Sequence, residues 1–263
     1  MCRDVPALIA ATLLIPTVAR GQSAQHDDVE VIDAPAFKSA DEKKPDLAAV
    51  TKYIVEKTNE FRVKEGRPRV TVDTKLTETA RDFADYMART GRYGHTADGS
   101  RPADRAAKHG YEYCIVAENI AYAFDSAGFT SDELGKKFVE RWKESPGHRK
   151  NMLDPDVTQT GAAVARSEKT GYYFAVQVFS RPKSQAVEFK VENRSSATVT
   201  YRIGEKEFSL PPRYTRTHEQ CRPTEVAFEL TAGGKAAPES RKAETGAKFV
   251  VLEERGALRV KKE

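Results

Sequence analysis

Two histidines and one glutamate stand in sequence surroundings that favour chemistry. His95 lies in the loop RYGHTADG, His148 lies in the segment WKESPGHRKNML, and Glu118 interrupts the apolar stretch CIVAENIAY. Burial of an unpaired carboxylate is unfavourable, so Glu118 should have a cationic, metal or hydrogen-bonding partner. Neutral imidazole is a common zinc ligand, and an imidazole beside a carboxylate can also transfer protons. These residue types therefore allow either a metal site or an acid–base site.

The other three histidines fit structural roles better. His26 belongs to a charged N-terminal stretch. His109 stands beside Gly110 at the expected end of a short helix, where a histidine interacts favourably with the helix C-terminus. His218 lies in RYTRTHEQC with no carboxylate pattern around it. We expect it to be a surface histidine or a locally hydrogen-bonded one.

Ser145 has two interpretations. It precedes Pro146 and the turn that carries His148, and a serine before a proline is typical of a helix N-cap. The alternative is a nucleophile paired with His148, three residues further on. We favour the cap, because the hydroxyl oxygen of a capping serine is already occupied.

The N-terminus resembles an export signal. Residues 5–19, VPALIAATLLIPTVA, carry no charge and are followed by the small residues of ARGQSA. A membrane span needs about 20 residues, so the run predicts a secretory signal peptide over residues 1–24, with a buried helix as the alternative. Cleavage is expected between Gly21 and Gln25. The mature protein is then extracytoplasmic, secreted or periplasmic, and does not span a membrane.

Removal of this leader leaves two cysteines, Cys114 and Cys221. In an exported chain two remaining cysteines are a candidate pair. The sequence leaves two possibilities open, which are one bridge between domains or two buried thiols.

The elements that must position these residues are helices followed by a hairpin. Apolar residues recur at helical spacing after Asp46, after Asp73 or Thr74, and after the capping box that starts at Thr130. The expected helices are 46–65, 74–90, 102–109 and 130–144, and the expected strands are 160–166 and 172–180. This order predicts an α+β or layered α/β/α domain over residues 46–181. The charged residues 25–45 have no periodicity and predict a flexible lead-in.

The composition changes at residues 181–184. Beyond them the helical period disappears, and apolar and polar residues alternate between proline and glycine turns, up to a terminal hairpin made by KFVVLEE and ALRVKK. We predict a small all-β domain at 186–263. Basic residues outnumber acidic ones there, which is typical of a solvated surface or of contact with an anionic envelope.

The composition excludes several classes of function. The chain has 263 residues, with 43 basic against 39 acidic ones. A charge so close to balance gives no reason to expect a nucleic-acid partner, and no aromatic-interleaved basic motif is present. A glycine-rich phosphate loop is also missing from the sequence, which argues against a nucleotide enzyme.

Together the motifs resemble those of a known family. YGHTADG, AENIAY, W-x-x-S-P-G-H-R-x-N-M-L, GAAVA and YYFAVQVFS occur in this order, and Asn59 and Arg62 match an N-x-x-R element in the first helix. The pattern is similar to that of the CAP superfamily (cysteine-rich secretory proteins, antigen 5 and pathogenesis-related proteins, also called SCP-like). The SPGHR-x-N-M-L wording resembles the bacterial branch. The resemblance covers residues 47–181.

The resemblance implies an α/β/α sandwich with an open cleft that holds two histidines and two acids. Carried over, these positions are His95, Glu118 and His148, while Ser145 stands where the second acid is found in other branches. Helix geometry turns the neighbouring Glu140 and Glu144 away from that position. The resemblance also implies a divalent ion between His95 and His148. With so few protein ligands, we expect any zinc to be weakly held.

The resulting hypothesis is an exported CAP-domain protein that binds a ligand in its cleft. The ligand class, whether lipid, envelope component or protein, is left open. One alternative is a metal-assisted or acid–base hydrolase of peptides or cell-wall material. The other is an adhesion or scaffold protein that acts through its β domain.

Overall fold

The computed structural model describes residues 29–33, 42–232 and 235–263. The predicted signal peptide, its cleavage site and His26 lie outside the described residues. Within the described ranges, no helix has the length and apolar character needed to cross a membrane.

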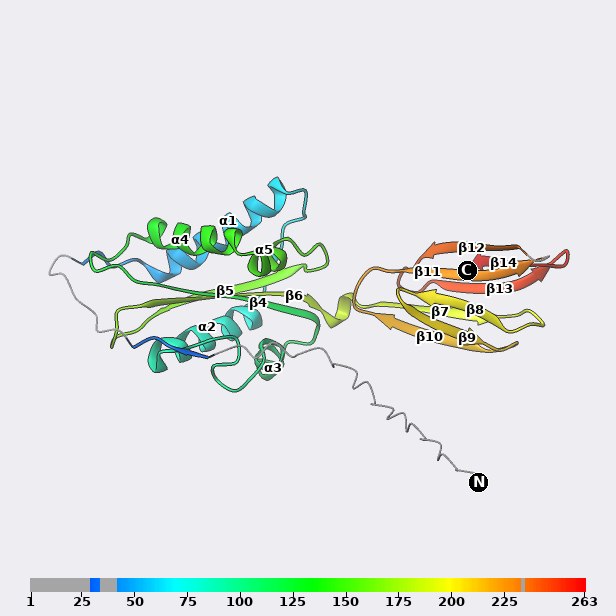
Figure 1. Ribbon diagram of the computed structural model, residues 1–263, viewed down its shortest axis with the longest axis horizontal. Coiled ribbons are helices and arrows are strands. Elements are labelled where there is room, and N and C mark those ends of the chain that lie inside the picture. The colour runs from blue at the N-terminus through cyan, green and yellow to red at the C-terminus, as the bar shows by residue number, and fades with distance from the viewer. Residues whose placement is uncertain (1–28, 34–41, 233–234) are drawn as a thin grey trace, which may run out of the picture.

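The molecule consists of two domains placed end to end (Figure 1). The N-terminal domain is a four-stranded sheet in the order β2-β5-β6-β4, with a helical layer on each face (Figure 1). The strands are β2 (Thr71–Val72), β4 (Tyr113–Ala123), β5 (Gln159–Arg166) and β6 (Tyr173–Pro182). One layer contains α1 (Leu47–Lys64), α4 (Ser131–Glu144) and α5 (Pro146–Leu153), and the other contains α2 (Thr74–Thr90) and α3 (Pro102–Lys108). The predicted α/β/α architecture is confirmed.

The helices begin and end where their capping residues predict. The Asp46 carboxylate accepts the backbone N–H of Ala48 at 2.9 Å, and Asp73 accepts that of Leu76 at 3.1 Å. Thr130 and Glu133 form the expected capping box of α4. Gly91 ends α2 with a φ of 70°, a conformation that glycine adopts without strain.

Strand β4 is an edge strand that the sequence did not reveal, because it reads as an apolar run without alternation. Its free edge faces away from β6 and is covered by side chains from α4, from α5 and from strand β3 (Arg92–Tyr93). These side chains donate to three successive outward carbonyls: Asn151 to Glu118, Trp142 and Tyr93 to Ile120, and Arg141 to Tyr122. The cover satisfies an edge that would otherwise expose unpaired backbone groups.

The expectation of a flexible lead-in is wrong for its described residues. Strand β1 (Glu30–Val31) pairs with β3 (Arg92–Tyr93), and Glu42 forms an ion pair of 2.7 Å with Arg166. Lys43 lies against Gly128, where an added Cβ would be 2.0 Å from the Lys43 carbonyl oxygen. Backbone pairing and a largely buried charge pair thus hold segments that have no hydrophobic periodicity of their own.

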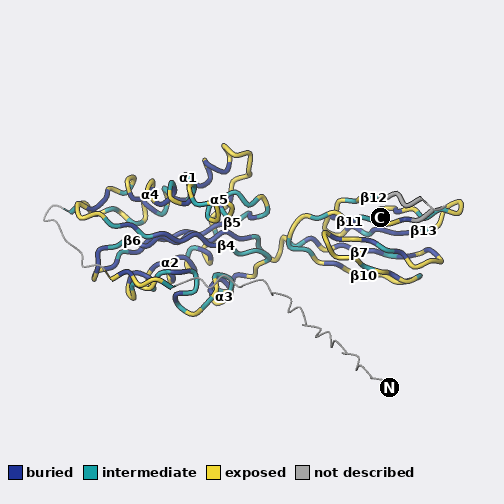
Figure 2. Tube along the Cα trace, in the orientation of Figure 1, coloured by how far each residue is buried: buried dark blue, intermediate teal, exposed yellow. Residues whose placement is uncertain are grey.

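The C-terminal domain is the predicted all-β unit. It follows a short 3-10 turn, η1 (Lys183–Gln185), and packs two four-stranded sheets face to face, in the orders β10-β7-β13-β14 and β12-β11-β8-β9. Its strands are β7 (Val187–Asn193), β8 (Val199–Ile203), β9 (Lys206–Leu210), β10 (Thr215–Gln220), β11 (Glu225–Ala232), β12 (Lys235–Lys242), β13 (Lys248–Glu254) and β14 (Ala257–Lys262). Aromatic residues from both sheets, Phe189, Tyr201, Phe228 and Phe249, fill the core. Figure 2 shows buried stretches of the chain, in dark blue, along the strands of both domains.

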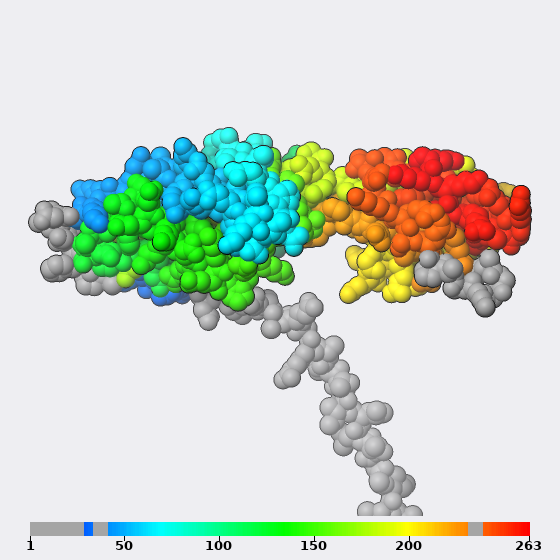
Figure 3. Space-filling model, turned by 90° about the horizontal axis from the view of Figure 1, so that it is seen from above, coloured from blue at the N-terminus to red at the C-terminus, as the bar shows by residue number. Residues whose placement is uncertain are grey.

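A disulfide joins the two domains. Of the two possibilities left open for the cysteines, the structure has the bridge, with the Cα atoms of Cys114 and Cys221 5.0 Å apart. The C-terminal domain extends the long axis of the N-terminal domain (Figure 3).

Candidate functional site

Three separate elements bring the predicted site residues together at the β4 edge. His95 comes from the loop between β3 and α3, Glu118 from β4, and His148 from α5. The His95 backbone is held in place by Arg105, whose Nη2 donates to the His95 carbonyl oxygen at 3.0 Å. The His148 carbonyl oxygen accepts from Asn119 Nδ2 at 3.1 Å. Arg105 therefore holds the backbone at His95, and Asn119 holds the backbone at His148.

Glu118 has both a cationic and a hydrogen-bonding partner, as its burial required. Its side chain is 1% exposed. Arg105 Nη2 donates to both carboxylate oxygens, at 3.0 and 2.8 Å. His95 Nδ1 lies 2.9 Å from Glu118 Oε1. The prediction that this carboxylate needs a partner is confirmed.

This contact determines which nitrogen of His95 can bind a metal. A carboxylate only accepts hydrogen bonds, so the Nδ1 that faces Glu118 carries the proton. In neutral imidazole the lone pair is then on Nε2. A histidine oriented by a carboxylate in this way is the usual arrangement around protein-bound metals.

His148 is held in its neutral form. Its ring centroid lies 6.3 Å from that of His95, with 56° between the ring planes. Burial lowers the pKa of His148, and the neighbouring His95 and Arg141 lower it further. Its Nδ1 is buried and has no hydrogen-bond partner among the described residues. An unpaired nitrogen of a neutral imidazole is a potential metal ligand.

The spacing of the rings allows one ion to be shared. A zinc-bound imidazole has its centroid about 3.2 Å from the ion, so two such centroids lie about 5.2 Å apart at a tetrahedral angle and at most about 6.4 Å apart. The observed 6.3 Å lies within this limit, and a tetrahedral site needs the rings to approach by about 1 Å. The described residues contain no cluster of three or more histidine, cysteine or acidic side chains arranged around a metal position. Any ion would thus rest on the two imidazoles.

Ser145 occupies the predicted N-cap position of α5, but its side chain makes no capping hydrogen bond. The expectation that its oxygen is occupied by capping is therefore wrong. The helix turn is held instead by the Ser145 carbonyl oxygen, which accepts from Arg149 N at 2.8 Å. Glu140 pairs with Lys143, and both Glu140 and Glu144 line a cavity of about 690 Å³ whose lining includes neither histidine.

The remaining described histidines have structural partners. His109 ends α3, and its Nε2 lies 3.2 Å from Asp82 of α2. His218 is buried, and its Nε2 lies 2.7 Å from the Tyr201 hydroxyl of the facing sheet. The expectation of a surface or local contact for His218 is wrong, because strand alternation turns its ring inward against Phe189.

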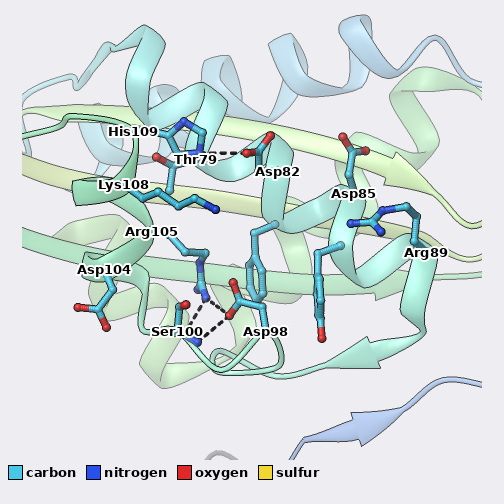
Figure 4. Close-up of a pocket in the computed structure, with 12 residues that line it drawn as sticks. Thr79, Asp82, Asp85, Arg89, Asp98, Ser100, Asp104, Arg105, Lys108 and His109 are labelled. Atoms are coloured by element: carbon cyan, nitrogen blue, oxygen red, sulfur yellow. Dashed lines mark hydrogen bonds and ion pairs between the residues drawn. The ribbon is translucent and has the colours of Figure 1, made fainter.

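Arg105 is the site residue that sequence reasoning missed. Its guanidinium stacks on Phe83 at 3.5 Å and also bonds Asp98 at 2.8 Å. Figure 4 shows it beside Ser100 and Asp98 in the wall of a cavity of about 570 Å³ between α2 and α3. The signal available in the sequence was the carboxylate of Glu118 within an apolar stretch, which required a cationic, metal or hydrogen-bonding partner without indicating which residue supplies it.

Comparisons with known proteins identify a family for the N-terminal domain. Residues 55–179 match the family described as "CAP: Cysteine-rich secretory protein family". The uncharacterized protein YkwD of Bacillus subtilis is 32% identical over 46% of this chain and 44% of its own length. The uncharacterized membrane protein YlbC of the same organism is 31% identical over 45% of this chain and 32% of its own. The matched region spans less than half of either relative.

Two solved structures are also similar. An extracellular SCP-domain protein from Bacillus anthracis has 24% identity, covers 51% of this chain and 41% of its own, and gives a TM-score of 0.44. An outer surface protein from Borrelia burgdorferi has 20% identity, covers 51% of this chain and 93% of its own, and gives the same TM-score of 0.44.

Fold and site together define the class of the N-terminal domain. It is an α/β/α sandwich in which His95 contacts a carboxylate of the edge strand and His148 of α5 lies beside the His95 ring. Residues 55–179 of this domain match the CAP family, and a small β domain follows them in the chain.

Proposed function

We propose that this protein is an extracytoplasmic binding protein whose His95 and His148 hold a labile divalent ion, zinc, at the ligand site of the CAP domain. The observation that carries the proposal is the Glu118 contact to His95, which assigns the lone pair of that imidazole to Nε2. The neutral His148 ring beside it, with an unpaired buried nitrogen, supplies the second ligand. Ligands bound there are a lipid, an envelope component or a protein.

Binding is favoured over hydrolysis by the state of Glu118. Arg105 and His95 engage its carboxylate oxygens, so it is poorly placed to take a proton from water or substrate. Ser145 stands where a second carboxylate would be needed. The arrangement therefore supports a role in which the Glu118 carboxylate orients the His95 imidazole.

The cellular location is proposed from two features. The apolar leader predicts export. The Cys114–Cys221 disulfide fits an oxidising compartment, because thiols stay reduced in the cytosol. The basic excess of the β domain is consistent with contact to an anionic envelope.

The test is zinc titration calorimetry of full-length protein that has been stripped with chelator and dialysed. We expect wild type to bind one zinc ion and His148→Ala to bind it at least about tenfold more weakly. His109→Ala is the matched control, because His109 is a partly buried histidine that lies outside the pair. Equal affinity in wild type and His148→Ala would place the metal elsewhere and overturn the proposal.

A further inference from the structure

One short segment of the β domain contacts two of the elements that carry the histidine site. Residues 221–224 connect β10 to β11, and two adjacent residues of this connection bridge the domains. Cys221 is bonded to Cys114 of β4. Arg222 pairs with Asp154 and Asp156, directly after α5. Strand β4 carries Glu118 and helix α5 carries His148.

The Arg222 contact has the geometry of a strong ion pair. Its Nη1 and Nη2 lie 3.0 and 2.9 Å from the two carboxylate oxygens of Asp154, and Nη1 also reaches Asp156 Oδ2 at 2.5 Å. The Asp154 side chain is only 16% exposed. Although burial opposes its ionisation, hydrogen bonds from Arg222 and from the Asp156 backbone hold the pKa of Asp154 below its ordinary value. A forked pair of this kind fixes orientation as well as distance.

Asp154 is the residue at which α5 ends. From inside the domain, the fully buried Arg62 donates to the carbonyl oxygens of Met152 and Asp154, at 2.6 and 3.1 Å. Arg222 holds the same end from the β domain. The helix has eight residues, so a displacement of its C-terminal end moves His148 as well.

The same helix is tied to the carboxylate strand. Asn151 Nδ2 donates to the Glu118 carbonyl oxygen at 3.2 Å and to Asn119 Oδ1 at 3.0 Å. Cys114 lies at an irregularity in the pairing of β4 with β6, between the pairs Tyr113↔Pro182 and Ile115↔Arg181. A bulge of this kind redirects a side chain out of the sheet, here toward Cys221.

We propose that the Cys221–Arg222 segment is a clamp through which the β domain positions the histidine site. Cys221 holds the start of β4, and Arg222, a positioning residue, holds the end of α5. The β domain thereby regulates the separation of His95 and His148. The expected effect of the clamp on zinc affinity rests on the proposed function, whereas its effect on the position of α5 does not.

The first test needs no metal. Amide hydrogen exchange is measured on full-length, metal-free wild type, Arg222→Ala and Lys183→Ala. Lys183 is the matched control, because it pairs with Glu219 of β10 and ties η1 to the β domain without touching α5. We expect amides 149–153, which follow the first hydrogen bond of α5 from Arg149 N to the Ser145 carbonyl oxygen, to exchange about fivefold faster in Arg222→Ala and at the wild-type rate in Lys183→Ala. Unchanged protection of α5 in Arg222→Ala would overturn the clamp.

A second variant guards against misfolding. Arg222→Lys keeps the charge but loses the forked contact, so it should show a smaller increase in α5 exchange. If Arg222→Ala does not fold, Arg222→Lys decides the question alone. Wild-type protection of α5 in a folded Arg222→Lys would then contradict the clamp.

Zinc titration of the same proteins separates the two proposals. We expect Arg222→Ala to bind zinc about three- to tenfold more weakly than wild type, with Lys183→Ala unchanged. Absence of zinc binding in wild type would refute the metal site and leave the exchange result standing. Zinc binding that depends on His148 but not on Arg222 would refute the regulation and leave the metal site intact.

Discussion

At the scale of single residues, the burial of Glu118 depends on Arg105. A carboxylate inside an apolar strand predicts that a partner exists, and that much follows from CIVAENIAY alone. The identity of the partner does not follow, because Arg105 is 13 residues away on another element. For the same reason the presence of His95 and Glu118 in one cleft was implied by the family resemblance and not by their spacing.

Replacement of Arg105 by alanine should be strongly destabilising. It would leave the buried Glu118 carboxylate without its guanidinium partner and with only the contact to His95, and removal of one partner from a buried ion pair costs about 3–5 kcal/mol. The control is Arg101→Ala, which removes an ion pair from a side chain that is 75% exposed and should leave stability unchanged. Urea denaturation of both variants measures the difference. Equal unfolding midpoints would show that Glu118 has no need of its cation.

His218 should make stability depend on pH. Burial lowers its pKa below the ordinary 6.5, and Arg216 lowers it further. The unfolded chain therefore binds a proton at a higher pH than the folded chain does. The stabilisation is fully present above about pH 6.5 and is lost as the pH falls toward the lowered value, by at most about 1.4 kcal/mol per pH unit.

The measurement compares wild type with His218→Gln, which cannot titrate but keeps an amide near the Tyr201 hydroxyl. The difference in unfolding free energy between the two proteins should shrink between pH 7.5 and pH 5.5, by no more than about 1.4 kcal/mol. A difference that does not change with pH would show that His218 is not the group responsible.

At the scale of elements, local signals were sufficient for helices and insufficient for contacts across the sheet. Asp46, Asp73 and Thr130 act on backbone groups two or three residues away, so their effect is visible in the sequence. Strand β4 was missed because its apolar run does not alternate, and its position at the sheet edge depends on distant residues such as Trp142 and Asn151 that cover it. The lead-in was misjudged for a similar reason, since its partners lie far along the chain.

Gly128 should be essential for docking of the lead-in. It has a φ of +71°, and an added Cβ would lie 2.0 Å from the Lys43 carbonyl oxygen. Gly66 has a φ of +70° with nothing within 4 Å of an added Cβ. Both alanine variants carry the strain of a positive φ, about 1 kcal/mol, but only Gly128→Ala must also displace Lys43.

Thermal unfolding of the two glycine variants separates these effects. Gly128→Ala should lower the melting temperature clearly more than Gly66→Ala does. In addition, the ion pair between Glu42 and Arg166 should be weakened only in Gly128→Ala, so that removal of Glu42 costs less in that background. Identical melting temperatures would indicate that Lys43 moves aside without cost.

At the scale of the whole molecule, the two domains have separate cores and are joined by a few specific contacts. The apolar clusters of the α/β/α domain and of the β sandwich share no residue. Composition predicted the boundary near residues 181–184, because helical periodicity ends there. Composition could not predict the disulfide between the domains, because Cys114 and Cys221 are 107 residues apart and the sequence leaves their pairing open.

The bridge should determine whether the domains unfold together. It closes a loop of 107 residues, and in the chain-entropy model such a loop stabilises the folded state by about 4–5 kcal/mol. Without it, the unfolding of one domain no longer restricts the other.

Urea denaturation followed by tryptophan fluorescence reports the N-terminal domain alone, because the chain's one tryptophan, Trp142, is buried there. Circular dichroism reports both domains. In the Cys114→Ser, Cys221→Ser double variant the two signals should separate into different midpoints, whereas in oxidised wild type they should coincide. Coincident midpoints in both proteins would mean that Arg222 and η1 suffice to couple the domains, and the bridge would then stabilise each domain without uniting them.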